Sequence, residues 1–380
     1  MYDIIAFAHL YKPHLGGLEK YVENFYKHLP NKKVLVVTSK YFKDLPTEEK
    51  DGTLDIFRID SIEIVKGKYF VPSLKGIREI KNIIDSNQKA EIHTHTRFYF
   101  TYCIALFFAK KYKLLHYHFD HSSSFVKDGS FLVRVLAYIF DHTFSKYVLN
   151  NAKYTFPISE SVKMFLKSTF KNIEYGPTLY NSYDFKNESF SKKKKPEILK
   201  LLFVGRIIRT KGVYELVKAC KRLKESNFKF KLTMIGDGSE ILEIKKLIKE
   251  YKLEEEVELK GALAYEDTQL LYPMYDLFIN PSYTEGLPTT VLEALGNNLF
   301  VVATDAGGTR EILPKEDLIH LDTLSGEVIK DRVFEIYENW DNEYVKYKNF
   351  YSSVKERFNW ESNTNKFIEF ISNRKENEQI

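Results

Sequence analysis

Two glutamates, Glu285 and Glu293, are separated by seven residues across a turn that contains Gly286, Leu287 and Pro288. An apolar run before them predicts a strand and a helix-like apolar spacing after them predicts a helix, so Glu285 is expected in a strand-to-helix loop. A helix N-terminus flanked by glycine offers backbone N–H groups and the positive end of the helix dipole, which suits a phosphate. Two carboxylates beside it can accept hydrogen bonds from sugar hydroxyls. Taken alone, the segment is equally consistent with an ordinary loop and a solvated carboxylate.

Two more predicted strands in the same half of the chain end in residues that suit a phosphate. Arg206 and Lys211 follow one strand and could clamp a diphosphate, by a planar fork and by a point charge respectively. Gly307 and Gly308 follow another strand and would let the backbone approach a ligand closely. Open α/β sheets bind ligands at such strand ends, so the C-terminal half is expected to hold a phosphate-bearing ligand.

The order of these residues resembles family 4 of the glycosyltransferases, the retaining enzymes with the GT-B fold. In the C-terminal half the resemblance is carried by Gly205-Arg206, Lys211, Ile235-Gly236-Asp237-Gly238, Pro281-Ser282, Glu285-x7-Glu293 and Gly307-Gly308-x-x-Glu311. In the N-terminal half it is carried by His14-Leu15-Gly16-Gly17-Leu18-Glu19, by Tyr180-Asn181-Ser182-Tyr183-Asp184, where Ser182 replaces the usual glycine, and by Phe358-Asn359-Trp360. The resemblance implies two Rossmann-like doubly wound domains that face each other across a cleft.

The resemblance also implies a reaction, the transfer of a sugar from a nucleoside-diphosphate sugar to a saccharide, lipid-linked saccharide or other hydroxyl acceptor in cell-surface glycan assembly. Arg206 and Lys211 are expected to stabilise the leaving diphosphate, helped by backbone N–H groups of Gly16 and Gly17. Glu293 is expected to bind the ribose. The remaining expected contacts lie at the donor sugar and the cleft wall: Glu285, Gly286, Leu287 and His118 at the sugar, with His95, Gly307 and Gly308 lining the cleft. No metal cofactor is expected.

His-x-His pairs end two predicted strands, His93 with His95 and His116 with His118. Alternate residues of a strand face one side, so each pair can point together, as in divalent-metal hydrolases. A metal-dependent hydrolase is therefore a distant alternative, since it gives the phosphate-type loops no role. A GT-B enzyme that epimerises or hydrolyses a sugar nucleotide is the nearer alternative. For His93 and His116, a histidine packed near the sheet is the favoured interpretation.

Composition limits the other functional classes. The 380 residues carry 57 basic and 52 acidic side chains, a dispersed excess that does not predict nucleic-acid binding. Ile241 stands where a dinucleotide fingerprint beginning at Gly236 needs its third glycine, which disfavours a nicotinamide cofactor. Cys103 and Cys220 lie in apolar stretches and are expected to be buried free thiols in a reducing compartment. The N-terminus leads directly into a predicted strand, so a cytoplasmic enzyme is expected.

Strands and helices are predicted to alternate along both halves, which indicates parallel β-α-β units. The expected domains are residues 1–185, which bind the acceptor, and residues 198–357, which bind the donor. A lysine-rich stretch before Pro196 predicts a solvated linker at 186–197, and the last helix, about 358–380, is expected to pack back on the first domain. The strands are expected at residues 3–8, 34–38, 54–59, 91–94, 114–118, 154–157, 199–204, 230–235, 256–259, 277–280 and 299–303.

The apolar stretches from Phe98 to Ala109 and from Phe131 to Phe140 are too short to span a bilayer. In and just after the second, aromatic residues from Phe131 to Tyr147 are interleaved with Arg134 and Lys146. The favoured interpretation is a buried helix with charges at its edge, because aromatic stripes at helical spacing usually form core. The alternative is a peripheral contact with the anionic inner face of a membrane.

Overall fold

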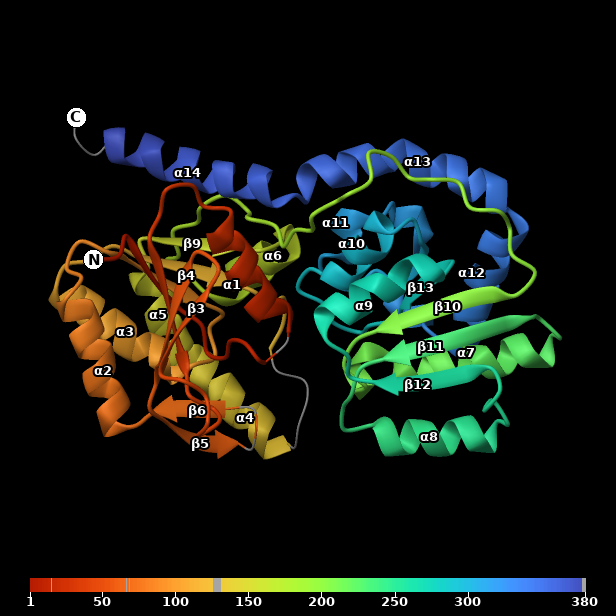
Figure 1. Cartoon of the computed structure of the whole chain (residues 1–380), viewed down its shortest axis with the longest axis horizontal. Helices are drawn as coiled ribbons and strands as arrows, with labels where there is room; N and C mark the ends of the chain where they lie inside the picture. Colours follow the sequence, from red (N-terminus) through yellow and green to blue (C-terminus); the bar gives the residue numbers. More distant parts are fainter. Residues whose placement is uncertain (15, 66, 68, 126–130, 378–380) are drawn as a thin grey trace. The chain divides into compact units, whose positions relative to one another are not determined.

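The computed structural model describes residues 1–14, 16–65, 67, 69–125 and 131–377, with side chains up to residue 374. Leu15 of the expected glycine loop and residues 378–380 of the expected last helix lie outside the described residues. The chain divides into two compact units (Figure 1). Unit 1 contains Met1–Tyr180 and the residues from Trp360 onward, and unit 2 contains Asn181–Asn359.

Unit 1 is built on a seven-stranded sheet in the order β3-β4-β2-β1-β7-β8-β9. All neighbouring pairs are parallel except β3 with β4. The chain leaves the sheet's centre first in one direction and then in the other, so the topological switch point lies between β1 and β7. The strands are β1 (Ile4–Phe7), β2 (Val34–Ser39), β3 (Glu48–Asp51), β4 (Leu54–Ile59), β7 (Glu91–His95), β8 (His116–Asp120) and β9 (Tyr154–Pro157), with a separate hairpin of β5 (Ser61–Val65) and β6 (Tyr69–Pro72).

The helices of unit 1 bury aromatic residues against this sheet. Helix α1 buries Tyr21, Val22 and Phe25, which recur at helical spacing. Phe367 of α14 packs against Phe25, with 5.5 Å between ring centroids, so the C-terminal helix belongs to the same core. The helices are α1 (Gly17–Lys27), α2 (Leu74–Asp85), α3 (Phe100–Lys111), α4 (Phe131–Phe140), a π-helical turn (Asp141–Ser145), α5 (Lys146–Asn151), α6 (Glu160–Thr169) and α14 (Trp360–Asn377).

Unit 2 repeats the doubly wound arrangement with a fully parallel six-stranded sheet in the order β12-β11-β10-β13-β14-β15. Its switch point lies between β10 and β13. The strands are β10 (Leu199–Val204), β11 (Phe230–Ile235), β12 (Val257–Gly261), β13 (Leu277–Asn280), β14 (Phe300–Thr304) and β15 (Leu318–Ile319). The helices are α7 (Val213–Glu225), α8 (Ile241–Glu250), α9 (Tyr265–Leu271), α10 (Thr289–Gly296), α11 (Thr309–Ile312), α12 (Gly326–Glu338) and α13 (Trp340–Arg357), with 3-10 turns at Arg209–Lys211, Tyr272–Met274, Lys315–Asp317 and Leu321–Thr323.

The predicted α/β class and the eleven predicted strands are confirmed, since each coincides with an observed strand to within two residues at either end. The prediction missed β3, the β5–β6 hairpin and β15. β3 consists of charged, largely exposed residues and β5 is largely exposed, so neither has the buried apolar run that marks the other strands. β15 is only two residues long. Cys103 and Cys220 are buried free thiols, as predicted.

The stretch 186–197, which the sequence suggests is a solvated linker, is mostly exposed, but a few of its side chains anchor it on unit 2. Phe190 is 2% exposed and its ring lies 5.2 Å from that of Tyr347. Lys193 donates from Nζ to the carbonyl of Tyr275 at 2.6 Å, and Trp340 donates from Nε1 to the carbonyl of Lys193 at 2.9 Å. The chain therefore passes between the units at Tyr180–Asn181 and returns at Asn359–Trp360. A single aromatic anchor inside a lysine-rich run gives no periodic signal that sequence inspection could detect.

Helix α4 corrects the prediction of a buried helix over 131–147. None of its residues is buried, and Leu132, Leu136 and Ile139 are 64%, 56% and 52% exposed. Burial begins only in the following turn, where Asp141 and Ser145 are enclosed. An apolar helix is ordinarily covered by another layer, but the described residues leave α4 exposed. Within the described ranges, no helix combines the length and the apolar character needed to cross a bilayer.

Candidate functional site

Loops at the carboxyl edge of the unit 2 sheet bring Lys211 and Glu285 together. Lys211 ends the 3-10 turn after β10, and Glu285 lies between β13 and α10. The Nζ of Lys211 is 2.7 Å from Oε1 of Glu285, and Nδ2 of Asn280 donates to the same oxygen at 3.4 Å. Their side chains are 21% and 9% exposed, so a cation and a carboxylate are held in a fixed, largely desolvated pair. Sequence spacing could not reveal this contact.

Two glycines allow these loops to approach each other closely. Gly212 has φ +67°, and a Cβ built on it would lie 1.9 Å from the carbonyl oxygen of Pro281. Gly307 has φ +50°, and its Cβ would lie 1.8 Å from the carbonyl oxygen of Glu285. Both positions require a residue without a side chain, because the backbone conformation is left-handed and the neighbour is itself backbone. The loops after β10, β13 and β14 therefore form one interlocked edge.

Arg206 lies in the loop directly after β10 and is exposed. Among the residues that the structure describes, none forms an ion pair with its guanidinium. Lys211 is already paired, so the two cations that the sequence assigns to a diphosphate differ in their surroundings. Arg206 can turn all of its donors toward a ligand, whereas Lys211 would share its charge between a ligand and Glu285.

Glu293 is held by a different set of contacts, in the second turn of α10. It is 6% exposed, and its Oε2 accepts a hydrogen bond from the hydroxyl of Tyr272 at 3.0 Å and from Nε2 of Gln269 at 2.9 Å. Burial, followed by the charge of Glu293, raises the pKa of Tyr272 well above its usual range, so the phenol remains a donor. Glu285 and Glu293 are therefore held by different partners.

The turn between the glutamates leads into a helix without a side-chain cap. The N-cap residue of α10 is Pro288, which has no side-chain acceptor for the first N–H groups. The N–H of Gly308 donates to the carbonyl of Gly286 at 3.0 Å, which fixes the turn against the loop after β14, and Leu287 is 5% exposed. The first turn of α10 thus presents backbone donors at the same edge as Glu285.

In unit 1, the glycine loop after β1 carries a carboxylate of its own. Gly16 is the N-cap of α1 and Gly17 its first residue. Glu19 turns back toward the loop, where its Oε1 lies 3.0 Å from Nδ1 of His14 and its Oε2 lies 2.5 Å from the position of a Cβ on Gly16. Glu19 is 7% exposed. The positive end of the α1 dipole therefore already has a negative group beside it, which the sequence analysis did not foresee.

His118 lies inside β8 and its ring is fully enclosed. Its Nδ1 is 2.9 Å from the hydroxyl of Thr94 and its Nε2 is 3.4 Å from Oδ2 of Asp120. His95, at the end of β7, is also fully buried, with Nε2 2.7 Å from the hydroxyl of Tyr26. The structure therefore places both predicted cleft histidines in hydrogen-bonded, enclosed positions. From these positions His118 and His95 could affect a bound ligand only through the residues that they contact.

His121 is the histidine that follows the last residue of β8, at the carboxyl edge of the sheet, and it is partly exposed. Its Nε2 is 3.4 Å from Nδ1 of His95, and its ring meets that of Tyr21 edge-on with 4.7 Å between centroids. Burial lowers the pKa of His121 to about 3, so its imidazole is neutral near pH 7. No role was predicted for His121, although its position just beyond a predicted strand was a usable signal.

The other two members of the His-x-His pairs, His93 and His116, are packed in the interior, as predicted. His93 is 2.9 Å from the Tyr26 hydroxyl through Nδ1, and His116 is 2.8 Å from the Thr94 hydroxyl through Nε2. Burial lowers the pKa of His116 to about 3. Within the described part of the chain, no group of three or more His, Cys, Asp or Glu side chains is arranged to hold a metal ion.

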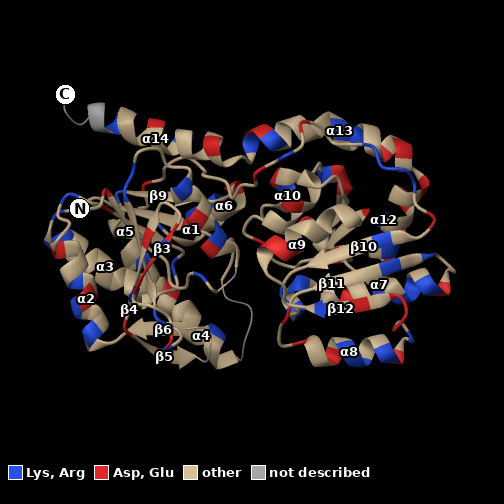
Figure 2. Cartoon of the chain, in the orientation of Figure 1, with Lys and Arg blue, Asp and Glu red and all other residues tan. Residues whose placement is uncertain are grey.

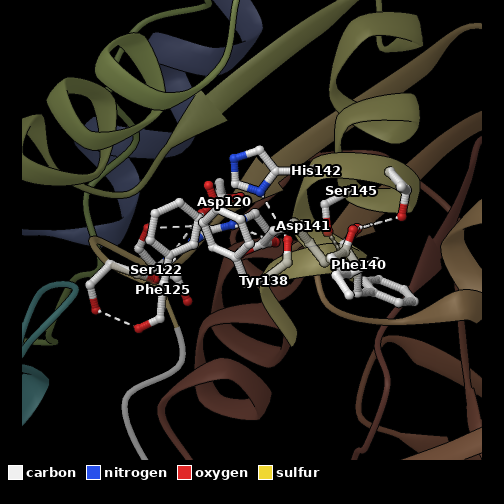
Figure 3. A network of polar contacts seen from close by, with 12 residues as sticks. Asp120, Ser122, Phe125, Tyr138, Phe140, Asp141, His142 and Ser145 are labelled. Carbon is white, nitrogen blue, oxygen red and sulfur yellow. Dashed lines mark hydrogen bonds and ion pairs between the residues drawn. The ribbon is translucent and has the colours of Figure 1, made fainter. Parts of the chain in front are cut away.

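A buried arginine fixes the chain that follows β8. Arg97 donates from Nη1 to Oδ1 of Asp120 at 2.7 Å and from Nε to Oδ1 of Asp141 at 3.2 Å, and all three side chains are 0% exposed. It also donates to the carbonyls of Ser122 and Ser124, at 3.0 and 2.8 Å. Figure 3 shows Asp120, Ser122 and Asp141 gathered round this network. The segment with His121 is thereby tied to the turn after α4.

Burial and charge shift the pKa values of the two carboxylates of this network in opposite directions. The Arg97 guanidinium and hydrogen bonds outweigh desolvation at Asp120 and hold its pKa at about 2. Desolvation dominates at Asp141 and raises its pKa to about 6. One arginine therefore faces a fully ionised carboxylate and one that is protonated in mildly acidic solution.

Comparison with known proteins agrees with this architecture. Residues 15–174 match the family model described as Glycosyltransferase Family 4, and residues 184–351 match that described as Glycosyl transferases group 1. An uncharacterized glycosyltransferase of Methanocaldococcus jannaschii is 30% identical over 383 residues, which cover 96% of both chains. The GPI3 subunit of phosphatidylinositol N-acetylglucosaminyltransferase from Saccharomyces cerevisiae is 20% identical, over 98% of this chain and 83% of the relative.

The fold has solved counterparts as well. The structure of Anabaena HepE in complex with UDP and glucose has a TM-score of 0.74 at 15% identity, over 98% of this chain and 100% of HepE. The two family models in sequence order, a relative of matching length at 30% identity and this likeness of fold agree with each other. The chain therefore belongs to family 4 of the glycosyltransferases and has the GT-B fold.

Proposed function

We propose that this enzyme transfers a hexose from a nucleoside-diphosphate sugar to a hydroxyl of a saccharide or lipid-linked saccharide, with retention, in the assembly of cell-surface glycans. The observation that carries the proposal is the fixed Lys211–Glu285 pair at the carboxyl edge of unit 2, with Arg206 in the same loop region as Lys211. The solved HepE complexes, which contain UDP and glucose or UDP-glucose, support a nucleotide-sugar donor. The likeness to the GPI3 subunit of phosphatidylinositol N-acetylglucosaminyltransferase supports a lipid-linked acceptor.

In this proposal Arg206 and Lys211 bind the diphosphate and stabilise the charge that grows on it as it leaves. Glu285 binds a hydroxyl of the donor sugar and also holds Lys211 in place, since the two side chains are already 2.7 Å apart. Glu293 binds the ribose hydroxyls. Gly16 and Gly17 remain in the proposal as backbone donors to the ligand, and Gly307 and Gly308 as the residues that bring the loop against Glu285.

Retention is proposed to occur on one face of the sugar. The bond between the anomeric carbon and the diphosphate breaks, the acceptor oxygen bonds to the same face, and the acceptor proton passes to a donor phosphate oxygen. Glu285 is not assigned as a nucleophile, although retaining glycosidases use a carboxylate in that role. Its Oε1 is engaged by Lys211 and Asn280, which suits a binding group better than an attacking one.

The proposal assigns the histidines two kinds of role. His121, at the edge of the sheet, is the ring that contacts the donor sugar, where its neutral imidazole can accept a hydrogen bond from a sugar hydroxyl. His118 and His95 are positioning residues, because His118 reaches Asp120 and His95 reaches His121 from enclosed sites. The reaction is proposed to need no metal ion, since cationic side chains and helix N-termini supply the positive charge.

The proposed function is tested with a panel of UDP-, GDP- and ADP-sugars. One donor is expected to raise the melting temperature well above the others, because a ligand that binds only the folded state stabilises it by mass action. With that donor and an acceptor, the product is expected to keep the anomeric configuration, and the yield to be unchanged by EDTA. If epimerised or hydrolysed sugar forms at the same rate with and without acceptor, the proposed transfer reaction is contradicted. If EDTA abolishes activity and zinc or manganese restores it, the histidines would have to be reinterpreted as metal ligands.

A second prediction separates the two glutamates. Glu293→Gln is expected to weaken binding of the free nucleoside diphosphate about tenfold or more, because a hydrogen bond to a charged group contributes about 1.5–3 kcal/mol. Glu285→Gln and His121→Ala are expected to leave that affinity nearly unchanged and to lower transfer, since an interaction made only with the sugar cannot affect a ligand that lacks it. Calorimetric titration of the nucleoside diphosphate into each variant measures the difference.

The control for this comparison is Glu243→Gln, an exposed glutamate of α8 that pairs with Lys246. It is expected to bind and turn over as the wild type does. Equal loss of nucleoside diphosphate affinity in Glu285→Gln and Glu293→Gln would show that the segment acts as one unit. Loss only in Glu285→Gln would show that the two roles are reversed.

A further inference from the structure

Helix α4 is an apolar surface helix that the described residues leave largely uncovered, apart from the ring of Phe125 against Tyr138. Leu132, Leu136 and Ile139 recur at helical spacing and are all more than half exposed. Figure 2 shows α4 almost free of charge, whereas α8 on the surface of unit 2 carries charges of both signs along its length. A helix that is apolar around most of its circumference is ordinarily buried. Its exposure therefore calls for a covering partner.

The apolar surface continues from α4 onto its neighbours. Phe144 in the π-helical turn and Tyr147 in α5 are 43% and 39% exposed, and Phe107 of α3 is 59% exposed. Between α3 and this turn lies an open hollow of about 550 Å³, lined by apolar groups that include Phe100, Cys103, Ile104, Phe107, Phe144 and Tyr147. We call the exposed residues of α3, α4, the π-helical turn and α5 the α3–α5 face. An apolar surface of this continuity marks an interaction site.

The exposed charged side chains that the segments of the α3–α5 face themselves carry are all basic. Residues 100–113 and 131–147 carry five lysines and arginines and a single carboxylate, Asp141. That carboxylate is fully buried and paired with Arg97, so it adds no negative charge to the surface. Arg134 and Lys146 are exposed on the α4–α5 segment. Two copies of such a face would repel each other, whereas an anionic lipid surface is complementary to it in both charge and polarity.

We propose that the α3–α5 face docks the enzyme on the surface of an anionic lipid bilayer. Leu132, Leu136 and Ile139 enter the boundary between headgroups and acyl chains, and Arg134 and Lys146 meet the headgroup phosphates. The hollow beside α3 takes an acyl chain of the same lipids. This contact is separate from the transfer reaction, because none of these side chains belongs to the donor loops of unit 2.

The test is flotation of the full-length protein with vesicles. The wild type is expected to float with vesicles that contain phosphatidylglycerol, and to do so less as salt rises from about 0.05 to about 0.5 M, because the electrostatic part is screened. The triple variant Leu132→Ser, Leu136→Ser, Ile139→Ser is expected to lose vesicle binding about tenfold or more. The double variant Leu242→Ser, Leu270→Ser removes apolar residues that are 66% and 75% exposed in unit 2, and it is expected to bind vesicles as the wild type does.

Circular dichroism and nucleoside diphosphate titration on the same variants are expected to show that both retain their fold and donor site. A failed docking proposal is thereby distinguished from a failed donor assignment. The proposal is overturned if the wild type does not float with either anionic or zwitterionic vesicles, or if the triple variant floats like the wild type. It is also overturned if light scattering shows a wild-type dimer that the triple variant abolishes while no vesicle binding is seen. That result would make the face an interface between two copies of this chain.

Discussion

Replacing Lys211 or Arg206 with alanine is expected to remove most sugar transfer while the protein stays folded. Both residues lie in the loop region after β10, and both are proposed to contact the leaving diphosphate. Loss of one preorganised, charge-assisted contact to a developing charge raises the barrier by about 2–4 kcal/mol, which lowers kcat by a factor of about 30 to 1,000. Initial rates at saturating donor measure the effect, and thermal unfolding checks the fold.

The structure makes the two variants distinguishable. Arg206 is exposed and forms no ion pair among the described residues, so its loss should act on the ligand alone. Lys211→Ala also takes the 2.7 Å contact away from Glu285, so it should disturb the sugar site as well. In a double-mutant cycle, Lys211→Ala and Glu285→Gln are therefore expected to be strongly non-additive, while Arg206→Ala and Glu285→Gln should combine almost additively.

The matched control is Arg209→Ala. Arg209 lies in the same 3-10 turn as Lys211, is exposed, and stacks over the ring of Tyr214 at 5.2 Å. Arg209→Ala removes the same charge from the same loop. A general effect of loop charge would therefore lower transfer by this variant too. Transfer close to the wild-type rate is expected. Wild-type turnover by both Arg206→Ala and Lys211→Ala would contradict the assignment of the diphosphate site.

The sequence was sufficient for the fold because the buried parallel strands leave continuous apolar runs. It was also sufficient to place Arg206, Lys211 and Glu285 at strand ends, since those runs stop just before them. The contact between Lys211 and Glu285 spans 74 residues and depends on the left-handed Gly212 and Gly307, whose backbone conformations have no local signature beyond the glycine itself. A single sequence gives no access to such long-range geometry.

Burial was harder to predict than strand position. His118 was expected in a ligand site and lies enclosed, whereas α4 was expected in the core and lies exposed. The burial of both was missed for one reason, because residue type and periodicity describe an element by itself and not the layer that covers it; the predicted ligand role of His118 stays a prediction. Arg97 shows the same limit. Its two carboxylate partners are 23 and 44 residues away, and only the crossing of β8 and the turn after α4 brings them together.

Arg97→Ala is expected to produce the largest loss of stability of any substitution discussed. It would leave Asp120 and Asp141 buried without their cation, and breaking a buried ion pair by removing one partner costs about 3–5 kcal/mol in the free energy of unfolding. It would also release the carbonyls of Ser122 and Ser124, which hold the segment beside His121. Urea unfolding at pH 7 measures the change, and Arg134→Ala, which removes an exposed arginine of α4, is the control expected to unfold like the wild type.

The pH dependence of this network distinguishes its two carboxylates. The folded pKa of Asp120, about 2, is below its usual value of 3.8, so this group stabilises the fold at neutral pH and loses that contribution as pH falls through about 4 to 2. The folded pKa of Asp141, about 6, is above 3.8, so its contribution is full below about pH 4 and is lost as pH rises to 6. Asp141→Asn keeps an oxygen that can accept from Nε of Arg97 and cannot ionise. Its unfolding free energy is expected to lack the fall between about pH 4 and 6 that the wild type shows, and an unchanged pH profile would contradict the placement of a protonated carboxyl beside Arg97.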